Sequence, residues 1–390
     1  RDAGAIILAK VNLSEFASAG GAPEGYSSMG GQTRNPHDLT KAPAGSSGGT
    51  GAAIAAAFAQ FGLGTDTTGS IRGPSSANGI VGLKPTHGLL SRDGIVPFAL
   101  TFDTPGPMAR SVYDVAVSLG IMTGVDPADD ATKKSAGKFE TDYTRFLKRG
   151  ALEGARIGVA RDFFRQDAET DRVMEAAVVK LKELGASVID PVNYPEYLIV
   201  TDSAISGAVS RPEFKAQIAV YLATLKPGYP RTLAELVAKA EDPATAYTSP
   251  WKLASMKKQG LAAPELNDPG YLVARNEGLA FIRATVRATF AKHQLDALVY
   301  PTSPRPARPI EAVAAAARPI RPAGIASRTG FPDLIVPAGM TKDGLPVTIS
   351  FFGTKFSEGK LLGYGYDFEQ ATKARVLPKY TPALPGEIFE

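Results

Sequence analysis

Short apolar runs, separated by helix-like segments along most of the chain, constrain the fold more than any other feature of this sequence. The runs are rich in β-branched or aromatic residues and have Gly or Pro at their edges, and several are apolar on both faces. Strand-like runs that alternate with helical patterns predict an α/β fold built in layers. The runs span residues 5–10, 61–66, 155–160, 186–190, 296–301, 333–339 and 346–353.

Two local patterns refine this architecture. Residues 167–184 carry apolar side chains on one helical face, and Gly185 stands where that helix is expected to end. Residues 342–345, Lys-Asp-Gly-Leu, predict a tight turn between two strands, so part of the sheet is expected to be antiparallel. We therefore predict a mixed, twisted β-sheet core that is covered by helices on both faces.

Between residues 195 and 290 the periodicity becomes mostly helical. Thr232 and Glu235 have the spacing of a capping box, and several prolines are expected to divide the region into short helices. We expect this region to be an insertion in a single α/β core formed by residues 1–194 and 291–390. We also expect a natural N-terminal segment upstream, because a strand-like run begins only a few residues into the chain.

The composition narrows the functional classes. The 390 residues, 44% hydrophobic and 21% charged, can bury a large core, which argues against a disordered chain. The 43 Lys and Arg residues barely outnumber the 39 Asp and Glu residues, so neither nucleic acid nor a membrane surface is an expected partner. The lack of cysteine excludes disulfides, thiolate metal sites and a cysteine nucleophile. No apolar run is long enough to cross a bilayer, so we expect a soluble protein, with the cytoplasm slightly favoured over export.

Two loops rich in Gly, Ser and Thr lie on either side of an alanine-rich helix that is predicted over residues 50–60. The first loop carries Ser46 and Ser47, and the second, residues 65–70, ends at Ser70. A serine that cleaves an amide or ester needs a proton acceptor and N–H donors for the developing oxyanion. Consecutive N–H groups of the second loop could form such an anion-binding nest in front of the Ser70 hydroxyl. Helix capping explains one serine, but it does not explain a second serine loop after the next strand.

Two other assignments of the catalytic residues are less suitable. The three histidines, His37, His87 and His293, do not lie in segments that are otherwise built around a base, so a structural role is favoured for each. Residues 45–49 match the letters G-x-S-x-G, which would make Ser47 the nucleophile of a strand–turn–helix elbow. The preceding residues are polar and rich in turns and proline, so we interpret this match as accidental.

The sequence around the two loops resembles the amidase signature family of serine amide hydrolases. The similar segments are GQTRNPHDLTKAPAGSSGGTGAAIAAAFAQFGLGTDTTGSIRGPSSANGIVGLKPTHG, then TFDTPGPMARSVYDVA and, near the end, GFPDLIVPAGMTKDGLPVTISFFG. The likeness covers most of the chain and is weakest in the helical insertion. It implies the amidase signature fold and the hydrolysis of a carboxamide to a carboxylate and ammonia or an amine, without metal or cofactor.

The resemblance also implies roles for individual residues. Ser70 would be the nucleophile, and Ser46 would be the bridging serine of a Ser-Ser-Lys triad, preceded by a cis peptide bond. The substrate-binding residues follow from the same resemblance. Ala17 would line the substrate pocket, and the oxyanion hole would be formed by the backbone N–H groups of Thr67, Thr68, Gly69 and Ser70.

The lysine base of the family is expected outside the printed sequence. Its motif, a strand that ends in Lys-Asp, precedes the segment matched by residues 1–12, so the base would fall before Arg1. Lys10 matches a different family lysine, and Lys84 belongs to the GLKPT stretch. Where nothing supplies the upstream segment, we expect a nearly inactive chain.

Four residues near the serines carry further expectations. Ala44 and Thr68 stand where the family commonly has glycine, and a β-branched residue tolerates a positive φ poorly, so Thr68 is expected to alter the oxyanion loop. Asp66 and Arg72 flank the nucleophile, and we expect them to hold the loop through charge-assisted hydrogen bonds.

Three functions stay open at this level. The first is a stand-alone amidase acting on a small-molecule or peptide amide, since residues 213–225 and 363–375 resemble stand-alone amidases, including the peptide amidases. The second is the A subunit of a tRNA-dependent amidotransferase, which passes ammonia to a partner. The third is an inactive binding chain that lacks the base. The sequence does not select the particular amide or the oligomeric state.

Overall fold

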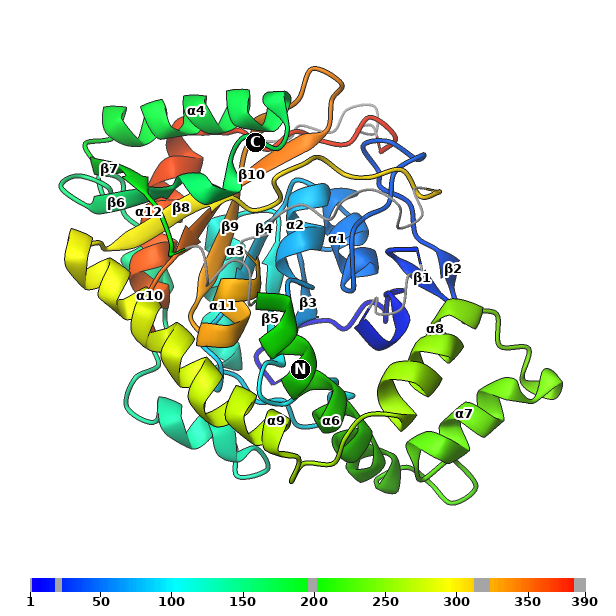
Figure 1. Cartoon of the computed structure of the whole chain (residues 1–390). Helices are drawn as coiled ribbons and strands as arrows, with labels where there is room; N and C mark the ends of the chain where they lie inside the picture. The colour runs from blue at the N-terminus through cyan, green and yellow to red at the C-terminus, as the bar shows by residue number, and fades with distance from the viewer. Residues whose placement is uncertain (1, 18–22, 196–201, 312–322, 382–390) are drawn as a thin grey trace.

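A computed structural model describes residues 2–17, 23–195, 202–311 and 323–381, and its centre is an eight-stranded sheet (Figure 1). The strand order is β3-β5-β4-β9-β10-β8-β6-β7, and a separate two-stranded sheet pairs β1 with β2. The strands are β1 (Tyr26–Ser27), β2 (Gly31–Gln32), β3 (Phe61–Asp66), β4 (Val81–Lys84), β5 (Thr104–Ala109), β6 (Arg156–Ala160), β7 (Ser187–Val192), β8 (Ala297–Pro301), β9 (Asp333–Met340) and β10 (Pro346–Phe352).

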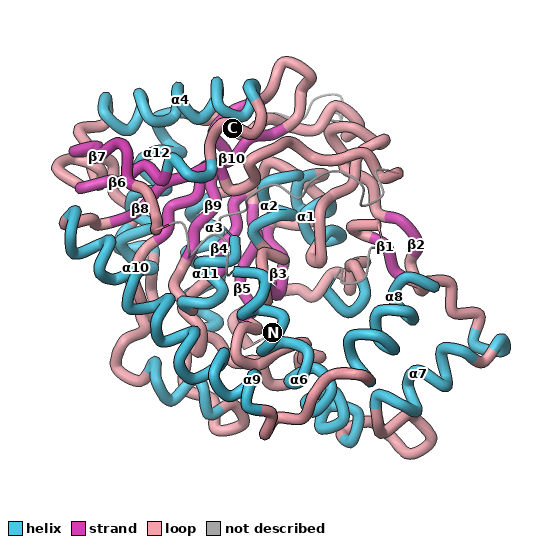
Figure 2. The backbone as a smooth tube through the Cα atoms, viewed as in Figure 1, coloured by secondary structure: helices cyan, strands magenta, loops and turns pink. Residues whose placement is uncertain are grey.

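Helices surround this sheet, as Figure 2 shows. The α-helices are α1 (Gly48–Ala55), α2 (Arg72–Ala77), α3 (Val112–Met122), α4 (Ala168–Glu183), α6 (Asp202–Ala223), α7 (Leu233–Glu241), α8 (Pro250–Ser255), α9 (Pro269–Val273), α10 (Leu279–His293), α11 (Ala323–Thr329) and α12 (Glu358–Thr372). Short 3-10 helices span Asp130–Ser135, Thr144–Phe146, Arg161–Phe163 and Pro243–Thr245, and π-helical turns span Met256–Leu261 and Ala274–Gly278. None of the described helices combines the length and the apolar character needed to cross a membrane.

The sheet is mixed, which confirms the prediction. Strand β6 pairs in parallel with β7 and β8, whereas the remaining neighbours from β3 to β8 pair antiparallel. The predicted turn at residues 342–345 joins β9 to β10, where Thr341 N donates to Leu345 O at 2.8 Å. The predicted helix at 167–184 is α4, which begins after the capping Asp167 and is followed by Gly185 at φ +85°.

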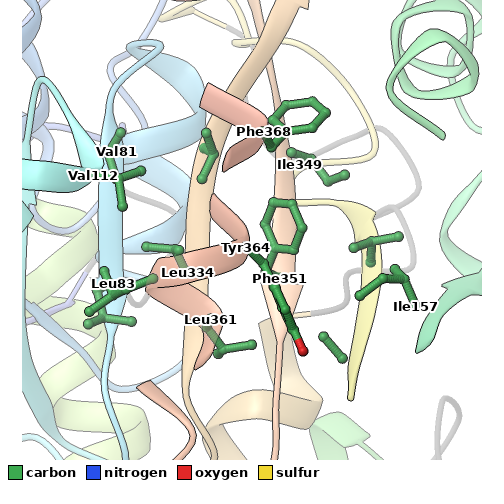
Figure 3. Packing of buried hydrophobic residues seen from close by; sticks show 14 of the residues in the cluster. Val81, Leu83, Val112, Ile157, Leu334, Ile349, Phe351, Leu361, Tyr364 and Phe368 are labelled. Atoms are coloured by element: carbon green, nitrogen blue, oxygen red, sulfur yellow. The ribbon is translucent and has the colours of Figure 1, made fainter. Parts of the chain in front are cut away.

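The two faces of the sheet bury separate sets of side chains because successive residues of a strand point to opposite faces. On β8, Val299 belongs to the larger hydrophobic core with α3, α4 and α12, whereas Tyr300 packs with α10 and α11 on the other face. On β10, Phe351 and Phe352 divide in the same way. Figure 3 shows the larger core, in which residues of β4, β9 and β10 meet α3 and α12.

One predicted strand is wrong, and four observed strands, β1, β2, β4 and β5, were not predicted; β1 and β2 contain only two residues each. Residues 5–10 form no strand in the described chain, and Ile6 is 91% exposed. An apolar run becomes a strand only where a neighbouring strand and a packed surface receive it, and this segment has neither. Strands β4 and β5 were missed because β4 is short and β5 contains Pro105 and Pro107.

The region predicted as an insertion is built from α6 to α10 and their connecting turns. Thr232 caps α7 by accepting from Glu235 N at 3.1 Å, which is one half of the predicted capping box, whereas the Glu235 carboxylate accepts from Arg231 N at 2.8 Å instead of from Thr232 N. Apolar side chains of α6, α7 and the π-helical turn at 256–261 form a hydrophobic cluster of their own. Its buried members are Phe214, Ile218, Leu222, Leu233, Val237 and Met256.

Candidate active site

The two serine loops lie side by side beyond the end of β3. Ser47 N donates to Ser70 O at 3.1 Å, and the Ser47 hydroxyl accepts from Thr65 N at 3.2 Å and donates to Thr65 O at 3.3 Å. The chain therefore brings together two loops that are separated by α1 and β3. The Ser47 hydroxyl serves this junction, and the residues before Ser47 form no strand–turn–helix elbow.

Ser46 and Ser70 are nearly buried and have unused hydroxyls. Ser46 is 8% exposed and Ser70 is 7% exposed. Neither hydroxyl forms a hydrogen bond with a residue that the structure describes. The Ser46 carbonyl accepts from Ser14 N at 2.9 Å, and the peptide bond between Gly45 and Ser46 is cis. Neither hydroxyl is therefore committed to a contact with a described residue.

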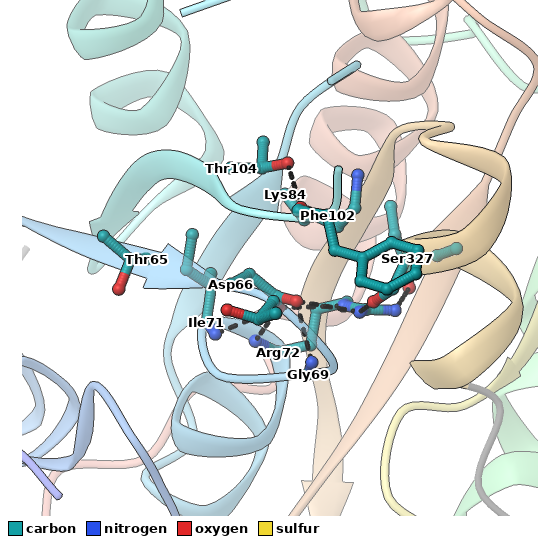
Figure 4. A network of polar contacts seen from close by, with 12 residues as sticks. Thr65, Asp66, Gly69, Ile71, Arg72, Lys84, Phe102, Thr104 and Ser327 are labelled. Atoms are coloured by element: carbon teal, nitrogen blue, oxygen red, sulfur yellow. Dashed lines mark hydrogen bonds and ion pairs between the residues drawn. The ribbon is translucent and has the colours of Figure 1, made fainter. Parts of the chain in front are cut away.

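The carboxylate of Asp66, at the end of β3, shapes the loop that carries Ser70. It accepts from Gly69 N at 2.7 Å and from Ile71 N at 3.0 Å, and the Arg72 guanidinium donates to both of its oxygens at 3.0 Å (Figure 4). Burial alone would raise the pKa of Asp66, but Arg72 and the N–H donors hold it below its usual value. The predicted charge-assisted hold on this loop is thus present.

Arg72 extends the network to distant parts of the sequence. Its guanidinium, 1% exposed, also contacts Asp333 Oδ2 at 3.3 Å and donates to Ser327 Oγ at 2.7 Å. Tyr300 donates its phenolic hydroxyl to the same Asp333 oxygen at 3.1 Å. Sequence reasoning missed Asp333, Ser327 and Tyr300, because they lie far along the chain and no local pattern marks them.

The N–H groups of the Ser70 loop differ in their availability. Gly69, at φ +131°, directs its N–H to Asp66, so this predicted oxyanion donor is already engaged. The N–H groups of Thr67, Thr68 and Ser70 form no hydrogen bond with any described residue. These three N–H groups could donate hydrogen bonds to an oxyanion.

The two glycine positions that this chain replaces behave differently. Thr68 does not have a positive φ, so its branched side chain puts no strain of that kind on the loop. Ala44 does, with φ 58°, in the loop before Ser46. The backbone at Thr68 therefore shows no sign of the alteration that we expected from its branched side chain.

One polar residue beside the loop was not singled out in the sequence. The Thr67 hydroxyl donates to Asp103 Oδ1 at 2.6 Å, and Asp103 stands immediately before β5. Both residues are nearly buried. The only available signal was an aspartate in the segment TFDTPGP, where prolines obscure the strand that follows.

Ala17 lies in a turn that the region 202–293 contacts. Phe16 and Ala17 have φ values of 44° and 60°, and Lys252 of α8 donates to Phe16 O at 2.9 Å. The same turn is linked to the first serine loop through the contact between Ser14 and Ser46. The Ala17 turn is thus connected to the first serine loop through Ser14, and its place at the substrate pocket stays a prediction.

Two of the three predicted structural histidines, His37 and His87, contact backbone carbonyls through their rings. His37 Nε2 lies 3.2 Å from Asn78 O, and His87 Nε2 lies 2.9 Å from Leu100 O. Burial lowers the pKa of His37, and burial together with the nearby Arg92 lowers the pKa of His87 to about 3. Among the described residues, no group of three or more His, Asp or Glu side chains could hold a metal ion.

Neither lysine considered in the sequence is set up as a base for the serines. Lys10 is exposed in a segment without regular secondary structure. Lys84 is fully buried, and its Nζ donates to Pro85 O and Phe331 O, both at 2.9 Å. Burial and the neighbouring Arg72 lower the pKa of Lys84 to about 8, but its ammonium contacts carbonyls.

Comparisons with known proteins point to one family. The family model described as Amidase matches residues 1–362. The chain is 39% identical to the native peptide amidase of Stenotrophomonas maltophilia, with a TM-score of 0.89 to its X-ray structure over 97% of this chain and 76% of that one. It is 36% identical to the A subunit of the glutamyl-tRNA(Gln) amidotransferase of Thermoanaerobacter pseudethanolicus, over 96% of this chain and 76% of that relative. The crystal structure of the corresponding A subunit of Thermotoga maritima gives a TM-score of 0.70 at 27% identity, over 96% and 76% of the two chains.

Proposed function

The chain belongs to the amidase family and is an amide hydrolase, and we propose that Ser70 is its nucleophile and Ser46 its proton relay. One observation carries this assignment. The unused hydroxyl of Ser70 stands in a loop whose N–H groups at Thr67, Thr68 and Ser70 have no other described partner. A nucleophile and oxyanion donors in one loop are what acyl transfer requires.

The proposed reaction proceeds through an acyl-enzyme. Ser70 Oγ attacks the carbonyl carbon of the amide and loses its proton to the Ser46 hydroxyl, which passes its own proton to a base. The free N–H groups stabilise the negative oxygen that results. The C–N bond then breaks as the leaving nitrogen receives the proton back. Water attacks the ester at Ser70, which releases the carboxylate and restores the Ser70 hydroxyl.

We propose a lysine outside the printed residues as the base of this scheme, as the family resemblance implies. Lys84 does not suit this role because its ammonium donates to two backbone carbonyls. Tests of activity therefore use the full-length protein. Replacing Lys84 by methionine should lower stability, whereas replacing the upstream lysine should abolish turnover in a protein that still folds.

A small-molecule or peptide amide is the proposed substrate. The similarity to the peptide amidase of Stenotrophomonas maltophilia, in identity and in TM-score, supports this class. A panel of aliphatic, aromatic and C-terminal peptide amides, assayed for ammonia release, would identify the preferred group. Release of ammonia from none of these amides by the full-length protein would contradict the proposed substrate class.

Covalent trapping tests the nucleophile directly. A fluorophosphonate should add to Ser70 with loss of fluoride, and peptide mass spectrometry should find the added mass on residue 70. The S70A variant should give no adduct. An adduct on Ser47 or on any other serine would contradict the assignment.

A second candidate function is that of an amidotransferase component. The 36% identity to the A subunit of the enzyme from Thermoanaerobacter pseudethanolicus favours it. In that case the protein would co-purify with a different polypeptide, and its glutaminase activity would depend on tRNA. A monomeric or homo-oligomeric enzyme that is active without tRNA would support the stand-alone amidase instead.

A further inference from the structure

Asp103 is a nearly buried carboxylate whose two oxygens both receive hydrogen bonds. Its Oδ1 accepts from the Thr67 hydroxyl at 2.6 Å, and its Oδ2 accepts from Phe98 N at 2.8 Å and Ala99 N at 2.9 Å. The residue is 5% exposed. A carboxylate is buried at large cost unless donors surround it, so this arrangement fixes the direction of each donor.

The Ser70 loop is therefore held at both ends by different aspartates. Asp66 binds the N–H groups of Gly69 and Ile71, on the two sides of Ser70. At the other end of the loop, Thr67 is held through its side chain by Asp103, and the next N–H groups have no described partner. The contact between Thr67 and Asp103 thus fixes the side chain of the residue whose N–H is the first of these donors.

The loop that precedes Asp103 is held against α6. This loop donates Leu100 N to Gln217 Oε1 at 2.8 Å and Thr101 N to Glu213 Oε2 at 3.0 Å. Glu213 is 1% exposed and also accepts from the Tyr271 hydroxyl at 3.1 Å. Asp103 thus connects a rigidly bonded loop to the residue that begins the oxyanion loop.

We propose that Asp103 is a positioning residue that aims the Thr67 N–H at the oxyanion through the Thr67 hydroxyl. This inference rests on the proposed function, because it assigns a purpose to an N–H group beside the nucleophile. A donor that is fixed before reaction stabilises the transition state without reorganisation, and a small misplacement weakens it. Binding of the substrate in its ground state does not depend on this donor in the same way.

Affinity for a transition-state analogue separates this role from a purely structural one. An aldehyde whose carbonyl carbon is attacked by Ser70 Oγ forms a tetrahedral adduct with a negative oxygen, whereas the corresponding alcohol binds without one. In the full-length protein, T67V and D103N should each lower aldehyde affinity roughly tenfold or more and leave alcohol affinity within about twofold. The double variant should bind the aldehyde no more weakly than the single variant with the lower affinity, because both changes act on the same contact between Thr67 and Asp103.

Two further variants serve as controls. T67S keeps the hydroxyl and should retain wild-type aldehyde affinity. T104V removes another buried hydroxyl, which donates to Phe102 O at 2.9 Å, and should lower stability without changing the ratio of the two affinities. A lower Tm for T67V and D103N with an unchanged affinity ratio would overturn the inference. Absence of a Ser70 adduct in the wild-type protein would contradict the proposed function itself.

Discussion

Ser46 and Ser47 are neighbours in sequence with contrasting surroundings. The Ser47 hydroxyl exchanges two hydrogen bonds with the backbone of Thr65, whereas the Ser46 hydroxyl bonds to no described residue. A hydroxyl committed to the backbone contributes to stability, whereas a hydroxyl without a described partner is available for the proton transfer that we propose for Ser46. Residue identity alone does not separate the two serines, but their contacts do.

Replacing each serine by alanine should therefore give opposite results. S46A should fold normally and lose roughly a hundredfold to ten-thousandfold in kcat, because a proton relay is removed. S47A should keep most of its activity and lose about 1–2 kcal/mol of unfolding free energy, because two backbone hydrogen bonds are removed. Urea denaturation and ammonia release measure the two effects. Loss of activity in a stable S47A variant would reverse the assignment.

The ion pair between Asp66 and Arg72 should dominate the stability of the site. Both side chains are almost fully buried, so D66N leaves the guanidinium without its main partner and should cost about 3–5 kcal/mol. The pKa of Asp66 lies below its usual value of 3.8, so the stabilisation is present at neutral pH and is lost as pH falls through the lower, folded-state pKa. The difference in unfolding free energy between wild type and D66N should shrink below pH 4. A difference that is independent of pH would contradict this account.

The candidate site was predictable from the sequence where its parts are local. Ser70, Asp66 and Arg72 lie within one short segment, so their pattern could be recognised together. Asp333 joins the same network across the sheet and Asp103 joins from a different loop, and only folding brings these residues near Ser70. The engagement of Gly69 with Asp66 also depends on loop geometry that residue types do not reveal.

At the level of elements, the long apolar runs were predictable and the short or unusual strands were not. Strand β5 lies inside the sheet, yet it contains Pro105 and Pro107. Proline is unfavourable in an interior strand, so the sequence did not predict a strand here. Its pairing with β4 is limited to Met108 and Ala109, beyond both prolines, so no ladder to β4 is interrupted. The apolar run at 5–10 shows the opposite case, since its composition fits a strand but no partner strand receives it.

Helix α8 is fastened to the rest of the protein by a buried lysine. Lys252 is 1% exposed and donates to Phe16 O, and the nearby Tyr247 donates to Glu15 Oε1 at 2.9 Å. Burial lowers the pKa of Lys252 to about 8, against an ordinary value of 10.5. Between these values the unfolded chain binds more protons than the folded one, so stability should rise with pH.

The K252M variant isolates this effect. The unfolding free energy of the wild type, relative to K252M, should increase by up to about 1.4 kcal/mol per pH unit between pH 8 and pH 10. Urea denaturation at several pH values measures the difference. K239M is the matched control, because Lys239 on α7 is 61% exposed, and its difference from the wild type should stay nearly flat. A flat difference for K252M would show that Lys252 titrates as in the unfolded chain.

The whole molecule contains several hydrophobic clusters of unequal size. The largest joins the sheet to α3, α4 and α12, whereas the cluster of α6, α7 and the turn at 256–261 contains far fewer buried side chains. Phe214 of α6 connects that smaller cluster to the rings of Phe16 and Phe98. Its ring lies 6.1 Å from the ring of Phe16 and 5.3 Å from that of Phe98, measured between centroids.

Because a small cluster opens at lower free energy than a large one, α7 and α8 should exchange their amide protons sooner than β9 and β10. F214A should widen this gap, since removing a buried ring costs about 3–5 kcal/mol and the loss falls on the smaller cluster. Hydrogen exchange followed by mass spectrometry should show faster exchange in residues 233–261 and unchanged protection in residues 333–352. F351A, in the larger core, should instead accelerate exchange across the sheet. Equal acceleration of both regions by F214A would mean that the helices and the sheet unfold as one cooperative unit.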